Sequence, residues 1–595
     1  MSPFSSISLI HLALVSVGGA VQQTPKAPPK APILRIEAGG HTSSVTSIAV
    51  DPAGKFVITA SNDKSARVWE LPSLKLVRVL RPPLGLTPEE GKLNAVALSP
   101  NGKIAAVGGW TGVEWDESNS VYMFDVSTGR IVQRFAGLPN AIDSLAFSRD
   151  GLRLAVGLAD GGLRVLNAAD GSLLVQDDMY SDAINSLDFD LHGQLVTCSE
   201  DGSVRIYNDQ GSLRALVARP PGSRPEGVAF SPDGTRVAVG DATKASVVVL
   251  SGSNLQEEFT ANTEGLGASV QNVAWSPDGT SLSAAASATN SDHRFIVRTW
   301  SEGGNGVSKD VAVAGNTVLA LAYTPAGGLV FSAGDGFGTM SAAGEVKRVD
   351  LPIADLSDLG THFRLTKDGG QVWFSYRAHG KEPVSFSTTA RTIVSDPVED
   401  ARLAAAPPKR ETAGFKVTDW FDNQHPKMNG TPITLDPFEV SESLAILPDG
   451  GGFVLGTEWY VRSFGSDGSA KWKIDTHGSA MSVNISGDGR LVVVAYGDGT
   501  VRWHRVRDGK ELLALYAHPD KKRWVIWTPS GYYDCSPDGE NLFGWSVNNG
   551  ADLAAGFYPP SSLRSRYYRP DVISRILSSM DEAAAVRDAN AHRKS

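Results

Sequence analysis

The stretch that decides the fold is Ser231-Pro232-Asp233-Gly234, a turn that the chain repeats without change at Ser276-Pro277-Asp278-Gly279. Proline presets a φ of about −65°, aspartate caps the turn with its side chain, and glycine supplies the positive φ of a tight hairpin. Apolar segments that read as strands flank such turns, as Val45–Val50 and Phe56–Ala60 do. The pattern predicts antiparallel hairpins with both faces largely buried.

The turn returns at a regular interval. Degenerate copies such as Ser99-Pro100-Asn101-Gly102 and Ser148-Arg149-Asp150-Gly151 keep its glycine, and the first eight turn glycines are spaced 41 to 49 residues apart. These glycines, with Gly414 as a degenerate copy, are Gly54, Gly102, Gly151, Gly193, Gly234, Gly279, Gly327, Gly369, Gly414, Gly450, Gly489 and Gly531. A period near 40–45 residues built of short strands is typical of propeller blades with about four strands each.

The sequence therefore predicts an all-β fold of tandem β-propellers with a short C-terminal helix. About 12 blade units are visible, and two rings of six or seven four-stranded blades are expected, because one ring of 12 would leave a wide, unfilled channel. We expect Ile33 to Ile36 to lend a closing strand to a C-terminal blade. The predicted segments are a signal peptide over 1–20, a Pro-rich linker over 21–32, propellers over 33–350 and 351–558, and a helical tail over 559–595.

The N-terminus resembles a targeting segment. Ile7 to Val17 is mostly apolar and is followed by Gly18-Gly19-Ala20, although no Lys or Arg precedes it. The run is shorter than the roughly 20 apolar residues that span a bilayer, and no other stretch is long enough. A periplasmic or secreted protein without a membrane span is predicted, with a cytoplasmic location as the alternative.

Composition narrows the class of partner. The net charge of −10 argues against nucleic acid as the main partner, since phosphate binding needs a basic surface. The two cysteines, Cys198 and Cys535, lie far apart in sequence and outside any metal-binding spacing, so two buried thiols are expected.

The first repeat resembles the WD-repeat family. Gly40-His41 opens it, Trp69-Glu70 closes it, and Asp63 lies six residues before Trp69. The resemblance implies a buried, hydrogen-bonded network of His41, Asp63, Trp69 and either Thr59 or Ser61, with a structural role. It covers residues 33 to about 548 but is degenerate after the first blade, where Leu166, Tyr207 and His504 take the place of the tryptophan.

Residues 523–572 resemble the segment that ends the WD-repeat region of bacterial proteins fused to a caspase-like peptidase domain. The matching features are aromatic and turn residues in the same order, including Tyr532-Tyr533 and Tyr567-Tyr568. Beyond them, Pro570 is placed to start an amphipathic helix with Val572, Ile573, Ile576, Leu577 and Met580 on one face. That helix could dock on a partner or pack against its own propeller.

No catalytic, metal-binding or cofactor-binding residues are assigned, and no cofactor is expected. The sequence lacks a Walker loop, HExxH, an EF-hand run and a GxSxG elbow. Asp467 to Asp475 resembles one repeat of quinoprotein enzymes, but a single copy is weak evidence. The long loop with Trp110, Trp115 and three acidic residues is a candidate binding loop. We expect a non-catalytic scaffold that binds a protein or peptide; a sensor of a caspase-like peptidase system and a quinoprotein-type enzyme are the alternatives.

Overall fold

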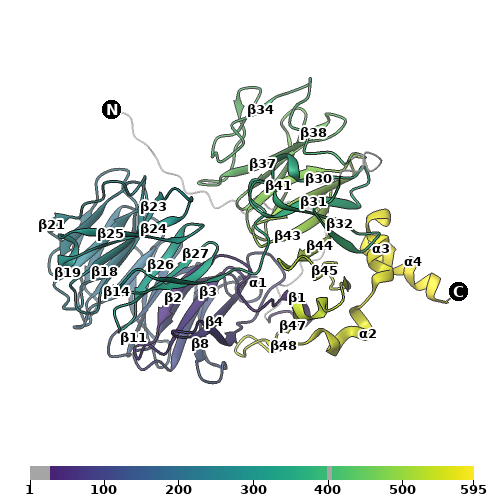
Figure 1. Ribbon diagram of the computed structural model, residues 1–595. Helices are drawn as coiled ribbons and strands as arrows, with labels where there is room; N and C mark the ends of the chain where they lie inside the picture. The colour runs from purple at the N-terminus through teal and green to yellow at the C-terminus, as the bar shows by residue number, and fades with distance from the viewer. Residues whose placement is uncertain (1–26, 399–404, 595) are drawn as a thin grey trace.

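A computed structural model describes residues 27–398 and 405–594 (Figure 1). The predicted signal peptide over 1–20 and the start of the Pro-rich linker lie outside the described residues. The chain is almost entirely β-structure, arranged in consecutive sheets of mostly four antiparallel strands, which confirms the predicted all-β fold of propeller blades.

Seven consecutive blades form the first ring, drawn from purple to teal in Figure 1. Blades 5 and 6 are joined into one eight-stranded sheet by the pair Asp241 and Val270. In chain order the blades are β2 (Val45–Val50), β3 (Phe56–Ser61), β4 (Ser65–Glu70) and β5 (Lys75–Leu80); β6 (Leu93–Leu98), β7 (Ile104–Gly109), β8 (Asn119–Asp125) and β9 (Ile131–Leu138); β10 (Ile142–Phe147), β11 (Arg153–Leu158), β12 (Leu163–Asn167) and β13 (Leu173–Asp177); β14 (Ser186–Phe189), β15 (Leu195–Cys198), β16 (Ser203–Tyr207) and β17 (Leu213–Ala218); β18 (Pro225–Phe230), β19 (Arg236–Asp241), β20 (Val247–Ser251) and β21 (Glu257–Thr260); β22 (Val270–Trp275), β23 (Leu282–Thr289), β24 (Phe295–Trp300) and β25 (Ser308–Ala314); and β26 (Val318–Tyr323), β27 (Leu329–Ala333), β28 (Gly336–Met340) and β29 (Val346–Asp350).

The ring is closed. The innermost strand of each blade contacts that of the next, and β2 of blade 1 contacts β26 and β27 of blade 7. Val57 and Trp69 of blade 1 are buried against Val330 and Phe337 of blade 7, and the Trp69 and Phe337 ring centroids lie 4.9 Å apart. Closure leaves each blade packed between two neighbours, so no sheet face of the ring is left uncovered.

The repeated turn is built as its residue types predict. The Ser231 hydroxyl donates to Asp233 Oδ1 at 2.6 Å, and the same oxygen accepts the Thr235 backbone N–H at 3.1 Å. The Arg236 N–H donates to Ser231 Oγ at 2.9 Å, and Gly234 takes a φ of 72°. These bonds tie the end of each innermost strand to the start of the next strand.

The second half of the chain, green to yellow in Figure 1, forms five further sheets among the described residues, and the last of them also includes the N-terminal strand β1. They are β30 (Arg364–Leu365), β31 (Gln371–Arg377), β32 (Lys381–Ser387) and β33 (Thr392–Ser395); β34 (Val417–Thr418), β35 (Lys427–Met428) and β36 (Thr431–Pro432); β37 (Ser441–Ile446), β38 (Gly452–Thr457), β39 (Tyr460–Gly465) and β40 (Ala470–Asp475); β41 (Ala480–Ile485), β42 (Leu491–Tyr496), β43 (Thr500–Arg505), β44 (Glu511–Ala517), β45 (Trp524–Trp527) and β46 (Tyr533–Cys535); and β1 (Ile33–Ile36), β47 (Phe543–Val547) and β48 (Gly556–Tyr558).

This half differs from the expected six or seven four-stranded blades. Gly414 does not adopt a positive φ, and it precedes the two-residue strand β34 instead of a blade hairpin. The turn at Gly531 opens no new blade either, because β45 pairs with β44 and extends the sheet that began at β41. The turn signal is local, whereas the choice between extending a sheet and starting one depends on the partner strand that is available.

The N-terminal strand β1 joins the two halves. It pairs antiparallel with β47, with Leu34 opposite Trp545, which confirms that Ile33 to Ile36 supply a strand to a C-terminal sheet. Nearby, the Arg81 guanidinium lies 4.1 Å from the centroid of the Phe557 ring, and the Asn548 amide bonds both N–H and C=O of Leu84 at 2.9 and 2.8 Å. Blade 1 of the ring is therefore fastened to the last sheet of the chain.

The C-terminal tail forms α2 (Arg564–Tyr567), α3 (Pro570–Ser579) and α4 (Glu582–Lys594). Pro570 begins α3 as predicted, and Val572, Ile573 and Ile576 are buried in one apolar cluster with residues of β31, β32 and β42 to β45. The helix contacts β44 and β46, so it packs on its own chain. Met580 ends α3 with a φ of 55°, which breaks the tail into two helices. None of the helices in the described part of the chain has the length and apolar character needed to cross a membrane.

Candidate binding sites

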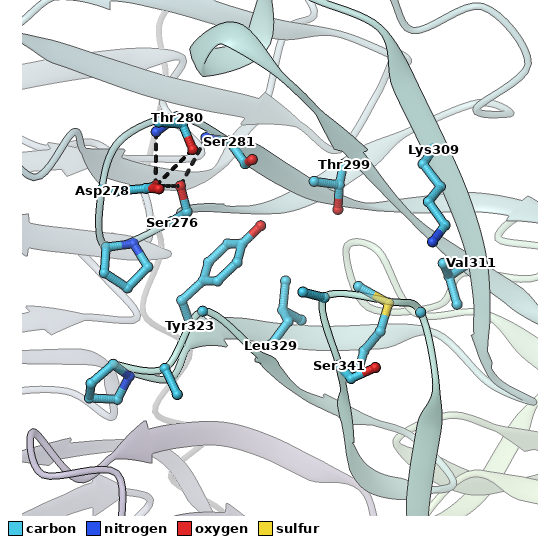
Figure 2. Close-up of a pocket in the computed structure, with 17 residues that line it drawn as sticks. Ser276, Asp278, Thr280, Ser281, Thr299, Lys309, Val311, Tyr323, Leu329 and Ser341 are labelled. Atoms are coloured by element: carbon cyan, nitrogen blue, oxygen red, sulfur yellow. Dashed lines mark hydrogen bonds between the residues drawn. The ribbon is translucent and has the colours of Figure 1, made fainter.

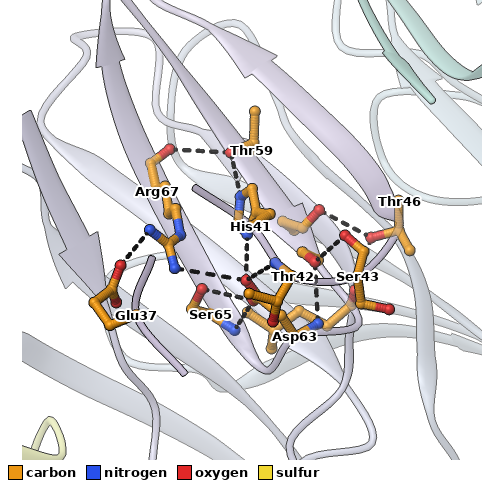
Figure 3. A network of polar contacts seen from close by, with 12 residues as sticks. Glu37, His41, Thr42, Ser43, Thr46, Thr59, Asp63, Ser65 and Arg67 are labelled. Atoms are coloured by element: carbon orange, nitrogen blue, oxygen red, sulfur yellow. Dashed lines mark hydrogen bonds and ion pairs between the residues drawn. The ribbon is translucent and has the colours of Figure 1, made fainter. Parts of the chain in front are cut away.

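The predicted polar network of the first blade is present (Figure 3). His41 Nδ1 lies 2.8 Å from Asp63 Oδ2, and His41 Nε2 lies 2.7 Å from Thr59 Oγ1. Trp69 Nε1 donates to the same Thr59 oxygen at 2.8 Å, which makes Thr59 the fourth member. Ser61 instead donates to the carbonyl of Ser43 at 3.0 Å.

Electrostatics fix the charge of this network. Burial lowers the pKa of His41 although Asp63 opposes the shift, so the imidazole is neutral at pH 7. Burial alone would raise the pKa of Asp63, but His41, Arg67 and Ser65 outweigh it and hold the pKa below its ordinary value. His41 and Asp63 are 2% and 7% exposed. Their role is to hold the blade together, because no substrate can reach them.

The polar network of the first blade extends to β1 and the residues that follow it, where the two halves of the chain meet. Arg67 Nη1 lies 2.6 Å from Glu37 Oε1, and Arg81 Nη2 lies 2.5 Å from Glu37 Oε2. Arg35 of β1 donates to the carbonyl of Asp63. The segment that follows β1 is thus held to blade 1 by the blade's own arginines.

The predicted binding loop of blade 2 is closed onto the connection between blades 1 and 2. It contains the short helix α1 (Val113–Asp116), where Trp115 is buried. The Glu90 carboxylate accepts the N–H groups of Gly112 and Glu114 at 2.6 and 3.2 Å. In return, the Glu114 carboxylate accepts the N–H groups of Leu86 and Thr87 at 2.8 and 2.6 Å. These reciprocal bonds hold the loop of blade 2 against the connection between β5 and β6.

The central channel of the ring is a cavity with a volume of about 720 Å³. The innermost strands of the seven blades line it. At the start of six of them the register shifts, so that one residue, or in blade 6 the pair Gln271 and Asn272, is left out of the ladder pairing. We take one such residue from each blade, with Asn185 at the same place in blade 4, and call the set the bulge ring: Thr46, Asn94, Asp143, Asn185, Glu226, Asn272 and Leu319. All of them except Glu226 line the channel.

Side chains of the bulge ring form hydrogen bonds between blades 1 and 2, 2 and 3, 4 and 5, and 6 and 7. Asn94 Nδ2 donates to Asp143 Oδ1 at 2.8 Å, and Asn185 Nδ2 donates to Glu226 Oε2 at 3.0 Å. Thr46 Oγ1 donates to the carbonyl of Leu93 at 2.7 Å. Asn272 Nδ2 donates to the carbonyl of Leu319 at 2.9 Å. Each bond joins neighbouring blades, so the ring both braces the channel mouth and makes it polar.

One side of this mouth is acidic. Burial raises the pKa of Asp143 to about 6, with the negative charge of Glu200 adding to the shift. Burial, then repulsion by Glu200, raises the pKa of Glu226 to about 7. Arg224 is the counter-ion of Glu200, at 2.5 Å. Carboxyl groups with raised pKa values favour a ligand that brings a positive charge or hydrogen-bond donors.

A second cavity, of about 440 Å³, lies between blades 6 and 7 (Figure 2). Tyr323 of β26 forms its floor, where its hydroxyl lies 2.6 Å from Ser283 Oγ, and Ser283 Oγ lies 2.7 Å from Thr299 Oγ1. Leu329 and Met340 supply apolar walls. The repeated turn of blade 6 supplies Ser276, Pro277 and Asp278 to the lining, but the turn pattern did not indicate a cavity, because the other walls come from a second blade.

The other residues that the sequence analysis singled out have structural roles or are free thiols. Asp467 to Asp475 forms a turn and the outer strand β40, and the Asp467 carboxylate caps the turn through Ser469. Cys198 is buried and Cys535 half-buried, both as free thiols, and burial raises the pKa of each, that of Cys535 to about 12. Within 27–398 and 405–594, no three His, Cys, Asp or Glu residues gather as metal ligands.

Comparison with known proteins agrees with the fold. A profile of the WD domain, G-beta repeat matches residues 33–70, the blade with the His41 network. The WD40 domain of Anaphase-promoting complex subunit 4 matches residues 115–192, and the Kelch motif matches residues 92–130. The chain is a β-propeller protein. More specifically, its first ring carries WD repeats.

Relatives align over part of the chain. Telomerase protein component 1 of Rattus norvegicus is 25% identical over 207 residues, which are 34% of this chain and 7% of that protein. Protein HIR1 of Mycosarcoma maydis is 28% identical over 28% of this chain and 18% of its own length. Small ribosomal subunit protein RACK1y of Oryza sativa subsp. japonica is 29% identical over 19% of this chain and 34% of its own length. The chain therefore covers well under two thirds of each relative.

Proposed function

We propose that this protein is a non-catalytic scaffold that binds a protein partner at the mouth of the seven-bladed ring, with Asp143 and Glu226 as contact residues. The observation that carries the proposal is the acidic side of the bulge ring, where these two carboxyl groups have raised pKa values. WD-repeat relatives support an interaction scaffold in general.

The chemistry of the mouth favours a basic or donor-rich segment of the partner. Asp143 and Glu226 each accept one amide hydrogen bond from the chain and retain further acceptor positions. A cationic group would also relieve the repulsion between Glu226 and Glu200. The overall charge of −10 favours such a partner at long range and disfavours nucleic acid.

A peptide-display selection against the full chain, repeated with a D143N/E226Q variant, tests this proposal. Both changes keep the size of the side chain and its oxygen acceptor, so the bulge ring stays bonded. Enrichment of Lys- or Arg-containing peptides on the native chain and its loss on the variant is the expected result. The matched control, D160N/E345Q, removes the same charge from two exposed residues. Equal enrichment on all three proteins would place the binding surface elsewhere.

The predicted secretion belongs to the same proposal: the scaffold acts in the periplasm or outside the cell. It is supported by the apolar run from Ile7 to Val17 and the small residues that follow. N-terminal sequencing of the protein from an envelope or culture fraction tests it. Cleavage after Ala20 is expected, and an intact N-terminus in the cytoplasmic fraction would contradict the proposal.

A further inference from the structure

The cavity between blades 6 and 7 has a counterpart between blades 3 and 4, and the comparison shows what the cavity fits. The counterpart measures about 250 Å³ against about 440 Å³. Arg153 lines it, at the second residue after the turn glycine Gly151. The Arg153 guanidinium carbon lies 5.2 Å from the centroid of the Phe189 ring. Its Nη1 and Nη2 donate to the carbonyls of Asp209 and Gly193 at 2.7 and 3.1 Å.

Blade 5 also has an arginine at this place, Arg236. Arg236 also stands two residues after its turn glycine, and its guanidinium reaches the turn of blade 6, where a Cβ at Gly303 would lie 3.5 Å from it. Its Nε donates to Glu258 at 2.8 Å. Its guanidinium carbon lies 5.6 Å from the centroid of the Phe259 ring of the same blade. In blades 3 and 5, an arginine at this position therefore takes up space beside the next blade.

Blade 6 places Ser281 where blades 3 and 5 have arginine. Serine is too short to reach the ring of Tyr323, which stands where Phe189 stands in blade 4. The larger volume is consistent with this difference, because Ser281 leaves open the space that an arginine side chain takes up between blades 3 and 4.

The larger cavity keeps residues at the places whose carbonyls bind the guanidinium of Arg153 in the smaller cavity. Gly327 and Ala342, whose places correspond to Gly193 and Asp209, both line it. The lining is more polar than that of the counterpart, because Thr299 stands where the smaller cavity has Val165. Behind it, the buried Ser283 replaces Ala155 and bonds the hydroxyls of Thr299 and Tyr323. The oxygens of Thr299 and Tyr323 add hydrogen-bond acceptors to the lining.

The charges at the rim are balanced. The Asp278 carboxylate lines the cavity and is held in place by Ser276 Oγ and Thr280 Oγ1 at 2.6 and 2.9 Å. Lys309 is the only cation of the lining, and its ammonium donates to the carbonyl of Ala343 at 2.7 Å. Figure 2 shows Lys309 across the cavity from Asp278, which leaves the Tyr323 ring between them.

We propose that this cavity binds an arginine side chain of a protein partner, in the place that Arg153 takes between blades 3 and 4. The planar guanidinium stacks on the Tyr323 ring and donates to the carbonyls of Gly327 and Ala342. Lysine binds less well because its ammonium cannot stack as a plane and bond two acceptors in one plane. This proposal rests on the proposed scaffold function in one respect only, namely that the arginine belongs to a protein partner.

Titration with N-acetyl-L-arginine amide, followed by saturation-transfer NMR, tests the proposal on the full chain. We expect saturable 1:1 binding with a dissociation constant on the order of 1 mM. The uncharged analogue N-acetyl-L-citrulline amide and the lysine analogue should bind at least tenfold more weakly. Equal binding of the arginine and citrulline compounds would overturn the proposal.

Three variants locate the site. Ser281→Arg supplies the chain's own arginine and should abolish binding, whereas the matched control Ser281→Ala should retain it. Tyr323→Leu removes the aromatic floor without filling the cavity and should also abolish binding. This second variant keeps the test valid if S281R does not fold. Unchanged affinity in S281R and Y323L, with both proteins folded by circular dichroism, would refute the site.

The outcome is independent of the channel mouth. D143N/E226Q should bind N-acetyl-L-arginine amide as the native chain does, because Asp143 and Glu226 do not line this cavity. Arginine-amide binding without any peptide enriched at the mouth would disprove the proposed function and leave the arginine site standing. Peptide enrichment without arginine-amide binding would disprove the arginine site and leave the proposed function standing.

Discussion

Trp69 Nε1 donates a hydrogen bond to Thr59 Oγ1 at 2.8 Å while the face of the same indole packs on blade 7. One side chain thus fixes the inside of the first blade and closes the ring. Thr59 is central to this, because its oxygen also meets His41 Nε2 at 2.7 Å. Loss of the hydroxyl leaves two buried nitrogens without a partner.

Thr59→Val is therefore expected to destabilise the ring by about 2 to 3 kcal/mol, since each buried group left without a hydrogen bond costs about 1 to 3 kcal/mol. Urea unfolding followed by tryptophan fluorescence measures the change. Thr59→Ser keeps the hydroxyl and should cost much less. Equal unfolding midpoints for the two variants would mean that the network contributes little to stability.

Glu226 makes the stability of the ring depend on pH. Its folded-state pKa is about 7, above the ordinary value of 4.5, so the folded protein holds this proton more tightly than the unfolded chain. The stabilisation is complete below about pH 4.5 and is lost as the pH rises through 7. Glu226→Gln should be more stable than the native chain by about 1 kcal/mol at pH 8, after allowance for partial exposure, and no more stable at pH 4.

Thermal unfolding of the native chain and E226Q at both pH values checks this prediction. Glu345→Gln, at an exposed residue, is the control and should show no such difference between the two pH values. A gain for E226Q of the same size at pH 4 and pH 8 would contradict the sign that burial predicts.

Strand β1 should act as a clasp between the halves. Leu34→Pro removes a backbone donor and cannot keep the pairing with Trp545, so β47 should open more easily. Hydrogen exchange of the amides of Phe543–Val547 is expected to accelerate about tenfold, while blade 4 stays protected. Ala31→Pro, before β1, is the control. Unchanged exchange in β47 would show that blade 1 contacts alone hold the last sheet.

Helix α3 should contribute to stability through its buried face. Ile576 is fully buried, so Ile576→Asp places a charge in the core and is expected to cost about 3 kcal/mol or more. Ser578→Asp adds the same charge on the exposed side of the helix and should be nearly neutral. Thermal unfolding compares the two. A neutral I576D would mean that the helix leaves the propeller in solution and is available to a partner.

Much of the fold could be predicted from local signals. The Ser231–Gly234 turn and its copies predict blades because proline, aspartate and glycine act within four residues of one another. His41, Asp63 and Trp69 identify the first blade for the same reason, since their spacing lies within one repeat. Gly414 and Gly531 show the limit, because a turn does not decide which strand will accept the next one.

The candidate sites depend on residues that no local pattern connects. Asn94 and Asp143 meet across two blades, and Ser281 and Tyr323 line one cavity from two blades, although 49 and 42 residues separate the members of these pairs in the chain. The role of Ser281 becomes apparent only when the ring shows that it occupies the position that Arg153 and Arg236 occupy in blades 3 and 5.

The sequence by itself determined the blades, the hairpin turns, the polar network of the first blade and the start of α3, because each rests on contacts within one repeat. Only the tertiary structure decided that seven blades close into a ring, that β1 pairs with β47, and where the channel mouth and the cavity beside Tyr323 lie. The physical reason is that hydrogen bonds within a hairpin are set by neighbours in the chain, whereas cavities form where the surfaces of separate blades meet.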